Sequence, residues 1–266
     1  MHEATPKLQR TERGFSLLEV MLSLTLLALL LVAVSEVVSF LFVPRAENER
    51  YEKASVLART TLEQLTRFLR VATPNSVRTG LSGACIEYLP VIAVTRYLDP
   101  LPTGSNGLSA TTTVNFGAPV TTNSSIKHAI IGAQAASELY TSGALSSRAS
   151  IATLQTGQAN LSAPHKFLRA SATSRVYLAA DPKRICRVDT SLFLVEGYGL
   201  DTGVVTSNAG IGTSALMATG LSDTNAVFTL TSLTGSNATL VEIELTLGGA
   251  AGAITVKRSV TLPNAP

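Results

Sequence analysis

The first part of the chain is dominated by one long apolar run. Residues 15–43 are almost continuously apolar and include only two charged side chains, Glu19 and Glu36. A helix from Phe15 to Glu36 would rise about 32 Å, close to the roughly 30 Å hydrocarbon core of a membrane. The pattern therefore predicts a transmembrane helix over 15–43.

A second, amphipathic helix is predicted over 44–73. Pro44 is expected to kink or interrupt the helix at the junction, because proline lacks a backbone N–H and clashes with the preceding turn. Pro74 ends the second helix, since a proline disfavours helical geometry at the residue before it. Apolar residues recur every three or four positions, which places them on one helix face: Tyr51, Ala54, Ala58, Leu62, Leu65 and Leu69. We expect this face to pack on the domain that follows.

Short β-type runs follow Pro74. In 239–247, Val241, Ile243 and Leu245 alternate with polar or exposed positions, as expected for a half-buried strand. Pro90 should split 85–98 into two strands, and Asp189–Thr190 should form a turn between two others. The runs that predict strands are 85–98, 174–180, 184–188, 191–199, 225–233, 239–247 and 253–262. Together these elements predict an α+β fold, a long N-terminal helix packed on an antiparallel β-sheet head at 74–266.

Residues 100–164 differ from the rest of the head. They are rich in Thr, Ser, Gly, Ala and Asn, and no helical or strand periodicity persists along them. We expect a long, partly ordered excursion from the head. The functional alternative is an exposed loop that presents a contact surface or carries glycans on Ser or Thr.

Composition and isolated side chains argue against several chemistries. The net charge is +3, with 15% charged residues, which favours neither bulk nucleic-acid binding nor a polyanionic tail. His2, His128 and His165 are isolated and lack metal-ligand spacing. The Gly80–Gly83 stretch, GLSG, lacks the strand–helix context of a nucleophile elbow. We therefore expect no enzyme activity, no cofactor and no metal site.

A basic run offers one alternative partner. Six Lys and Arg residues stand against the single acid Asp181 in 166–187, namely Lys166, Arg169, Arg175, Lys183, Arg184 and Arg187. DNA contact is mainly electrostatic, so the run is a candidate patch for DNA. Solvated charges on strands explain the same run, and few aromatic residues interleave it.

The N-terminus has the features of a membrane-targeting segment. Residues 1–14 are polar and contain Lys7, Arg10 and Arg13, so this leader should stay cytoplasmic and the head should lie outside. Glu19 would sit only about 6 Å into the apolar run. A carboxylate at a membrane centre costs about 2.5–3.5 kcal/mol, so an acid inside the run needs a purpose.

Three interpretations of this segment compete. A simple signal anchor would leave Met1 as the N-terminus. A secretory signal would be cut after the small-x-small stretch Ala33–Ser35, leaving Glu36 first. Neither interpretation explains Glu19.

The third interpretation is a family resemblance. The octapeptide RGFSLLEV, residues 13–20, resembles the processing site of type IV prepilins and type II secretion pseudopilins. The resemblance implies cleavage after Gly14 by a prepilin peptidase, methylation of the new amine on Phe15, and a fifth-position acid at Glu19. In that family the amine pairs with the Glu of a neighbouring subunit, which makes two ions tolerable in lipid. We adopt this interpretation.

Cys85 and Cys186 are the only cysteines, and both lie beyond the membrane in this topology. Two exported thiols usually pair, so a disulfide is expected, with two separate buried thiols as the alternative. The sequence around both resembles the heads of larger minor pilins, including those of mannose-sensitive haemagglutinin pili, and J-type minor pseudopilins of type II secretion.

These resemblances imply a specific cellular location and set of partners. The chain would be a single-pass inner-membrane protein with its head in the periplasm or another extracytoplasmic space, and would then join a pilus or pseudopilus. Its partners would be other pilins or pseudopilins through the N-terminal helix, the prepilin peptidase and the inner-membrane assembly platform. We expect a minor subunit that primes or caps assembly. The alternative is a membrane-tethered exported adhesin or DNA-binding domain.

Overall fold

A computed structural model describes Gly14, 16–98, 100–206, 212–222, 226–233, 238–248 and 253–263, without the side chains of 39–47 and Pro263. The chain forms two compact units, Met1–Glu52 and Lys53–Pro266. Phe15 and the leader before Gly14 lie outside the described residues. The elements comprise a long helix and three antiparallel sheets, which confirms the α+β prediction.

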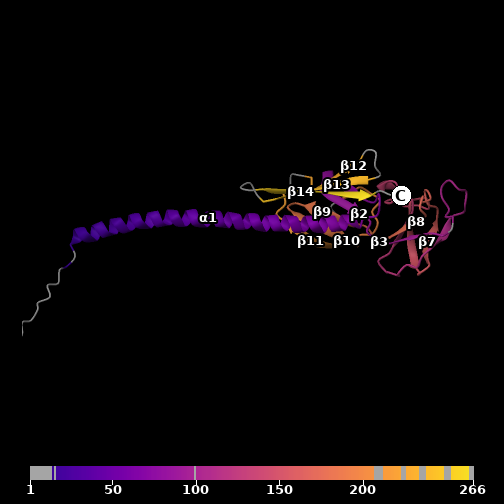
Figure 1. Ribbon diagram of the computed structural model, residues 1–266, viewed down its shortest axis with the longest axis horizontal. Helices are drawn as coiled ribbons and strands as arrows, with labels where there is room; N and C mark the ends of the chain where they lie inside the picture. The colour runs from indigo at the N-terminus through magenta and orange to yellow at the C-terminus, as the bar shows by residue number, and fades with distance from the viewer. Residues whose placement is uncertain are drawn as a thin grey trace, which may run out of the picture. The chain divides into compact units, whose positions relative to one another are not determined.

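One helix, α1, extends over Leu17–Arg70 and begins in the first unit (Figure 1). The predicted interruption at Pro44 is wrong, because the helix is continuous through that position. A proline removes one backbone hydrogen bond, and the bonds on either side can keep the remaining ladder helical. Tyr51 is also misassigned to the buried face, since it is 60% exposed.

The second unit packs the end of α1 against two sheets. The five-stranded sheet has the order β1-β2-β9-β10-β11, and the three-stranded sheet has the order β12-β13-β14. Ala58, Leu62, Leu65 and Leu69 are buried in one core with side chains of both sheets, as the helical spacing predicted. The strands are β1 (Arg78–Gly80), β2 (Cys85–Tyr88), β9 (Lys183–Val188), β10 (Ser191–Glu196), β11 (Thr213–Thr219), β12 (Phe228–Ser232), β13 (Ala238–Leu247) and β14 (Ile254–Pro263).

The two sheets approach closely at Gly83. Val227 N–H donates a 3.0 Å hydrogen bond to Gly83 O, which joins their neighbouring edges. Gly83 has a φ of +86°, and a Cβ added there would lie 2.5 Å from Phe228 O. Only glycine fits this contact without moving the backbone. The Gly80–Gly83 stretch therefore forms a strand end and a 3₁₀ turn (η1, Leu81–Gly83).

The third sheet forms a small closed barrel. Its strands are β3 (Val91–Arg96), β4 (Thr111–Asn115), β5 (His128–Ile130), β6 (Arg148–Leu154), β7 (Gln158–His165) and β8 (Arg175–Ala179). They pair in the order β3-β8-β5-β6-β7-β4. The outermost strands also meet through a Tyr97–Phe116 bridge, and Leu98 N–H donates to Asn115 O at 3.2 Å. We call this six-stranded unit the barrel.

The barrel overturns the expectation for 100–164. That region contains β4 to β7 and a short 3₁₀ helix, η2 (Ala136–Glu138), rather than a partly ordered excursion. The cause lies in the barrel's size, because the interior narrows as the number of strands falls. On the strands β5, β6 and β7 several inward positions are small, namely Ala129, Ala149 and Ala159, and larger side chains such as Phe116 and Phe167 lie outside the strands. The contrast between inward and outward positions is therefore too weak to show in the sequence.

The barrel is an insertion between two neighbouring strands of the five-stranded sheet. β2 leads into β3 and β8 leads into β9, while β2 pairs with β9 and β3 pairs with β8. We call this double connection the neck. In Figure 1 the strands β7 and β8 lie beyond the C-terminal end of α1. At the neck, Val91 N–H donates to Val71 O at 2.7 Å, and Ala180 N–H donates to Pro90 O at 3.0 Å.

Most of the other strand predictions are confirmed. Pro90 separates β2 from β3, and β9 and β10 form a hairpin around Asp189–Thr190. In β13, Val241, Ile243 and Leu245 are fully buried, as the period of two predicted. The sequence reading missed the short β1 and the edge strand β11. β11 has no charged residue to mark a solvent face.

Candidate functional site

The predicted processing residue Gly14 and the predicted assembly residue Glu19 lie at the N-terminal end of α1. Gly14 is exposed, and Glu19 lies in the first turn with its side chain also exposed. Glu19 N–H donates to Ser16 Oγ at 3.2 Å and to Ser16 O at 3.0 Å. Ser16 is therefore the N-cap, a role that the sequence reading missed. The Ser-x-x-Glu spacing of a capping box was the available signal.

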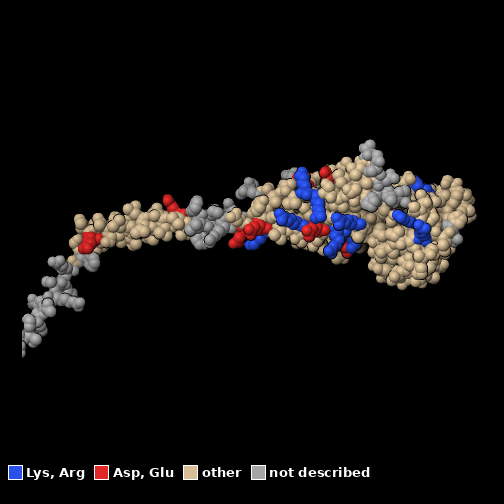
Figure 2. Space-filling view, viewed as in Figure 1, with Lys and Arg blue, Asp and Glu red and all other residues tan. Residues whose placement is uncertain are grey.

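An apolar, fully accessible helix surface follows this turn. Leu17–Val38 has a mean hydropathy of 2.6, and none of its side chains is buried within the structure. Figure 2 shows this surface as tan atoms interrupted by isolated acidic patches. At about 1.5 Å per residue such a segment is long enough for a hydrocarbon core of about 30 Å. Exposed apolar surface of this extent requires lipid or other apolar helices as its surroundings.

These features are consistent with a membrane-anchored chain whose apolar helix carries an acid in its first turn. A model of the family described as the prokaryotic N-terminal methylation motif matches residues 9–35. This match supports a type IV prepilin- or pseudopilin-type protein, and the N-terminal helix is consistent with membrane anchoring and export. The motif implies peptidase processing and pilin-type assembly in general. Comparisons with curated proteins and with solved structures found no match.

The two cysteines meet at the base of the neck. Cys85 and Cys186 are register partners on β2 and β9 and form a disulfide, as predicted. Both cysteines are buried, together with Val205. The bond ties together the two strands through which the chain enters and leaves the barrel.

A buried ion cluster lies beside the disulfide. Glu87 and Arg184 are register partners with fully buried side chains, and Arg184 Nη2 lies 2.8 Å from Glu87 Oε1. Arg78 pairs with the same carboxylate from β1, and Tyr198 OH donates to it at 2.7 Å. Arg184 also contacts Asp201 Oδ2 at 3.1 Å. Burial acts to lower the pKa of Arg184, but these acidic partners outweigh it and raise the pKa overall.

The ion cluster was missed in the sequence, although a signal was present. The segments Cys85-Ile86-Glu87 and Arg184-Ile185-Cys186 read alike in opposite directions, with Glu in place of Arg. If the two cysteines are direct partners on antiparallel strands, the Glu87 carboxylate must lie opposite the Arg184 guanidinium.

The predicted basic patch is divided by ion pairs. Arg184 is wholly buried in the cluster above, and Lys183 pairs with Glu196. Arg169 makes a two-pronged contact with Glu138, at 2.7 and 2.9 Å. Figure 2 shows acidic side chains close to basic ones on the second unit. Among the described residues the run is thus not a continuous cationic surface, and the geometry does not favour DNA contact.

A second polar network joins the barrel to the neck. The Arg148 guanidinium donates to Leu139 O at 2.7 Å and to Thr141 O at 2.9 Å, and its Nη1 lies 3.1 Å from His128 Nδ1. His128 Nε2 lies 3.0 Å from Asp181 Oδ1, in the connection between β8 and β9. Because arginine can only donate, Nδ1 must accept and Nε2 must carry the proton.

This geometry predicts a loss of stability in mild acid. Burial first, and then the charge of Arg148, lower the pKa of His128 to about 4, with Asp181 opposing and Lys127 adding to the shift. As the pH falls from 6.5 to 5, His128 becomes protonated in the unfolded state but stays neutral in the folded state. The free energy of unfolding therefore decreases as the pH is lowered. We expect a loss of about 1.6 kcal/mol over this range. Urea unfolding at several pH values measures the loss, and His128→Gln should remove most of it. An unchanged slope in the variant would contradict the assignment.

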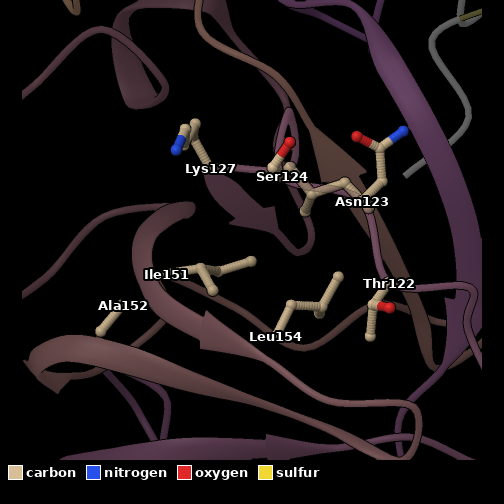
Figure 3. A pocket seen from close by; sticks show the side chains of 8 residues that line it. Thr122, Asn123, Ser124, Lys127, Ile151, Ala152 and Leu154 are labelled. Carbon is tan, nitrogen blue, oxygen red and sulfur yellow. The ribbon is translucent and has the colours of Figure 1, made fainter.

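A hollow on the barrel shows no converging polar groups. It has a volume of about 360 Å³ and lies between the loop before β5 and strand β6. Figure 3 shows Ile151 and Leu154 pointing into it, while the polar ends of Lys127 and Asn123 point away. No group of three or more His, Cys, Asp or Glu side chains in the described part of the chain could hold a metal ion.

Proposed function

We propose that this chain is a minor type IV pilin or pseudopilin, a non-catalytic subunit that primes or caps assembly of a pilus or a type II secretion pseudopilus. One observation carries the proposal. The methylation motif at 9–35 leads directly into an accessible apolar helix whose first turn presents Glu19. The apolar side chains of this helix could pack against the same helix of other subunits in a filament.

Glu19 acts in this proposal through charge pairing. Cleavage after Gly14 would leave a cationic amine on Phe15, which itself lies outside the described residues. The amine of one subunit and the Glu19 carboxylate of a neighbour are each costly in lipid but tolerable together. Only one axial stagger of neighbouring helices brings them together, so the pair would set the register of the filament.

The inserted barrel supports the minor role. It adds a complete folded unit to the β-sheet head, beyond the end of α1 (Figure 1). Identical heads with such an addition would crowd a densely packed shaft, whereas a tip accommodates them. The barrel also favours the second candidate, a membrane-tethered adhesin that contacts a surface ligand.

The mature N-terminus is the first test. We expect the purified protein to begin with methylated Phe15, because the peptidase cuts after Gly14. Mass spectrometry of the N-terminal peptide measures this directly. A chain that begins at Glu36 would indicate a secretory signal, and one that begins at Met1 a simple anchor. Either result would refute the proposal.

Substitution of Glu19 is the second test. We expect Glu19→Ala to be inserted and processed normally, but to enter filaments about tenfold less, the effect of losing about 1.4 kcal/mol. The amount of protein in sheared filaments, relative to the membrane fraction, measures this. Glu36→Ala is the matched control, since Glu36 lies near the other end of the same apolar segment. Equal incorporation of both variants and the natural chain would contradict the pairing role.

A further inference from the structure

Three triplets in the chain fit the acceptor pattern for N-linked glycosylation, Asn-x-Ser/Thr. They are Asn123-Ser124-Ser125, Asn160-Leu161-Ser162 and Asn237-Ala238-Thr239. The pattern marks a surface loop in an exported protein, but it also arises by chance in a chain rich in Ser and Thr. Structure must therefore separate usable triplets from unusable ones. Asn237 lies outside the described residues.

Asn123 is exposed in a surface loop, as a glycosylation acceptor must be. It lies in the loop between β4 and β5, and residues 121–125 are all exposed. Its Oδ1 accepts a 2.8 Å hydrogen bond from Ser125 N–H, so the triplet is closed into an Asx turn. This bond fixes the carbonyl side of the amide and leaves the amide nitrogen on the other side. Figure 3 shows the amide group turned outward, away from Ile151 and Leu154.

The loop is held at both ends by the barrel. Val120 N–H donates to Thr156 O at 2.8 Å, and Ile126 N–H donates to Asn123 O at 3.1 Å. Ile126 itself is buried in the barrel core. The turn is consequently a fixed feature of the barrel surface, and its conformation exists before any enzyme approaches.

Asn160 is the opposite case. It lies within β7, which pairs with β4 on one side and β6 on the other, so its backbone is fixed in a central strand. Its Nδ2 donates to Thr153 Oγ1 at 2.9 Å, and its Oδ1 accepts from Gln158 Nε2 at 3.2 Å. Both ends of this amide are engaged, and the chain around it could bend into a turn only by breaking the pairing of β7 with its neighbours.

We propose that Asn123 is a site of N-linked glycosylation. The reaction requires a lipid-linked diphosphate sugar and a membrane oligosaccharyltransferase on the side to which the head is exported. Asn123 Nδ2 loses one proton, which a base of the transferase accepts, and forms a bond to the anomeric carbon of the sugar. The bond from that carbon to the phosphate oxygen breaks, and the lipid diphosphate leaves with the electron pair. The hydroxyl of Ser125 is the group that the enzyme reads two positions after the acceptor.

The geometry supplies a sharp variant for the test. Ser125→Ala keeps the backbone N–H that closes the Asx turn and removes only the hydroxyl. Loss of the glycan in this variant would therefore report recognition of the triplet and not collapse of the loop. Ser124→Ala is the matched control, because Ser124 is exposed in the same turn but lies outside the required positions.

The experiment is glycopeptide mass spectrometry on full-length protein purified from membranes of the natural host. We expect a sugar mass on the peptide containing Asn123. It should be absent in Asn123→Gln and Ser125→Ala, restored in Ser125→Thr, and unchanged in Ser124→Ala and Asn160→Gln. An unmodified Asn123, or a sugar carried by Asn160, would overturn the proposal. A sugar that survives Ser125→Ala would do the same.

This inference rests on export of the head but not on filament assembly. The N-terminal peptide is read in the same mass spectra, so the two proposals can fail separately. Methylated Phe15 with a bare Asn123 would leave the pilin proposal intact and remove the glycosylation site. A glycosylated Asn123 on a chain that begins at Met1 or Glu36 would have the reverse meaning.

Discussion

Replacement of Arg184 by Met is expected to destabilise the second unit by about 3–5 kcal/mol, the range for breaking a buried ion pair. The variant leaves the fully buried Glu87 with only Arg78 as its cationic partner. It also removes the hydrogen bond from Arg184 Nη1 to Thr206 O, which measures 2.8 Å. Urea unfolding of the 53–266 fragment, followed by circular dichroism, gives the free energy of unfolding.

Lys183 provides the matched control for this experiment. It precedes Arg184 on β9, and its amine pairs with Glu196, but both side chains are substantially exposed. Exposed pairs contribute about 0–1 kcal/mol, so Lys183→Met should have little effect. Combining Arg184→Met with Glu87→Gln should be less destabilising than the two single effects added, because neither member of the fully buried pair is then left charged without the other. Additive effects would show that the two side chains are not coupled.

Loss of the disulfide is expected to have a comparable effect. Cys85 and Cys186 are separated by 101 positions, and a loop of about 100 residues contributes up to about 4.7 kcal/mol in the chain-entropy model. Measured values are commonly about 2–4 kcal/mol, so the Cys85→Ala, Cys186→Ala double variant should lose stability in that range. The same urea titration measures it, and the reduced natural chain is the control.

The size of this effect also depends on the barrel. If the barrel stays folded while the rest of the unit unfolds, only the short neck segments count as a flexible loop. A loop of about 15 residues corresponds to about 3 kcal/mol, against about 4.7 for the full length. A loss below about 1 kcal/mol would contradict the constraint altogether. Tyr97 and Tyr177 lie in the barrel, and their absorbance reports when it unfolds.

The parts that the sequence predicted are those with strong periodicity. Leu62, Leu65 and Leu69 stand at helical spacing, and burial on one face of α1 follows directly. Large aliphatic residues alternate in β13, so its two faces are also evident. The N-terminal methylation motif was predictable for a different reason. Its signal is local, since Gly14, Phe15 and Glu19 lie within one short motif.

The parts that were missed depend on contacts between distant positions. Glu87 and Arg184 lie 97 positions apart, and their pairing requires the register of β2 and β9. The barrel requires six short strands to close on one another, and no single strand among them has a distinctive pattern alone. Pro44 shows the opposite failure, because a strong local rule did not decide the outcome within the continuous α1.

The neck has a consequence for how this head could diversify. The strand leading in and the strand leading out are hydrogen-bonded neighbours, and Tyr88 and Lys183 are direct register partners. A simple hairpin turn could connect those two positions, so the pairing of β2 with β9 does not depend on which domain is inserted between them. Exchange of the barrel for a domain of another size would keep the strand pairing of both sheets, although it would remove contacts such as the hydrogen bond from Tyr140 OH to Ser76 O. The inserted domain could therefore change in evolution while the strands that carry it, β2 and β9, stay the same.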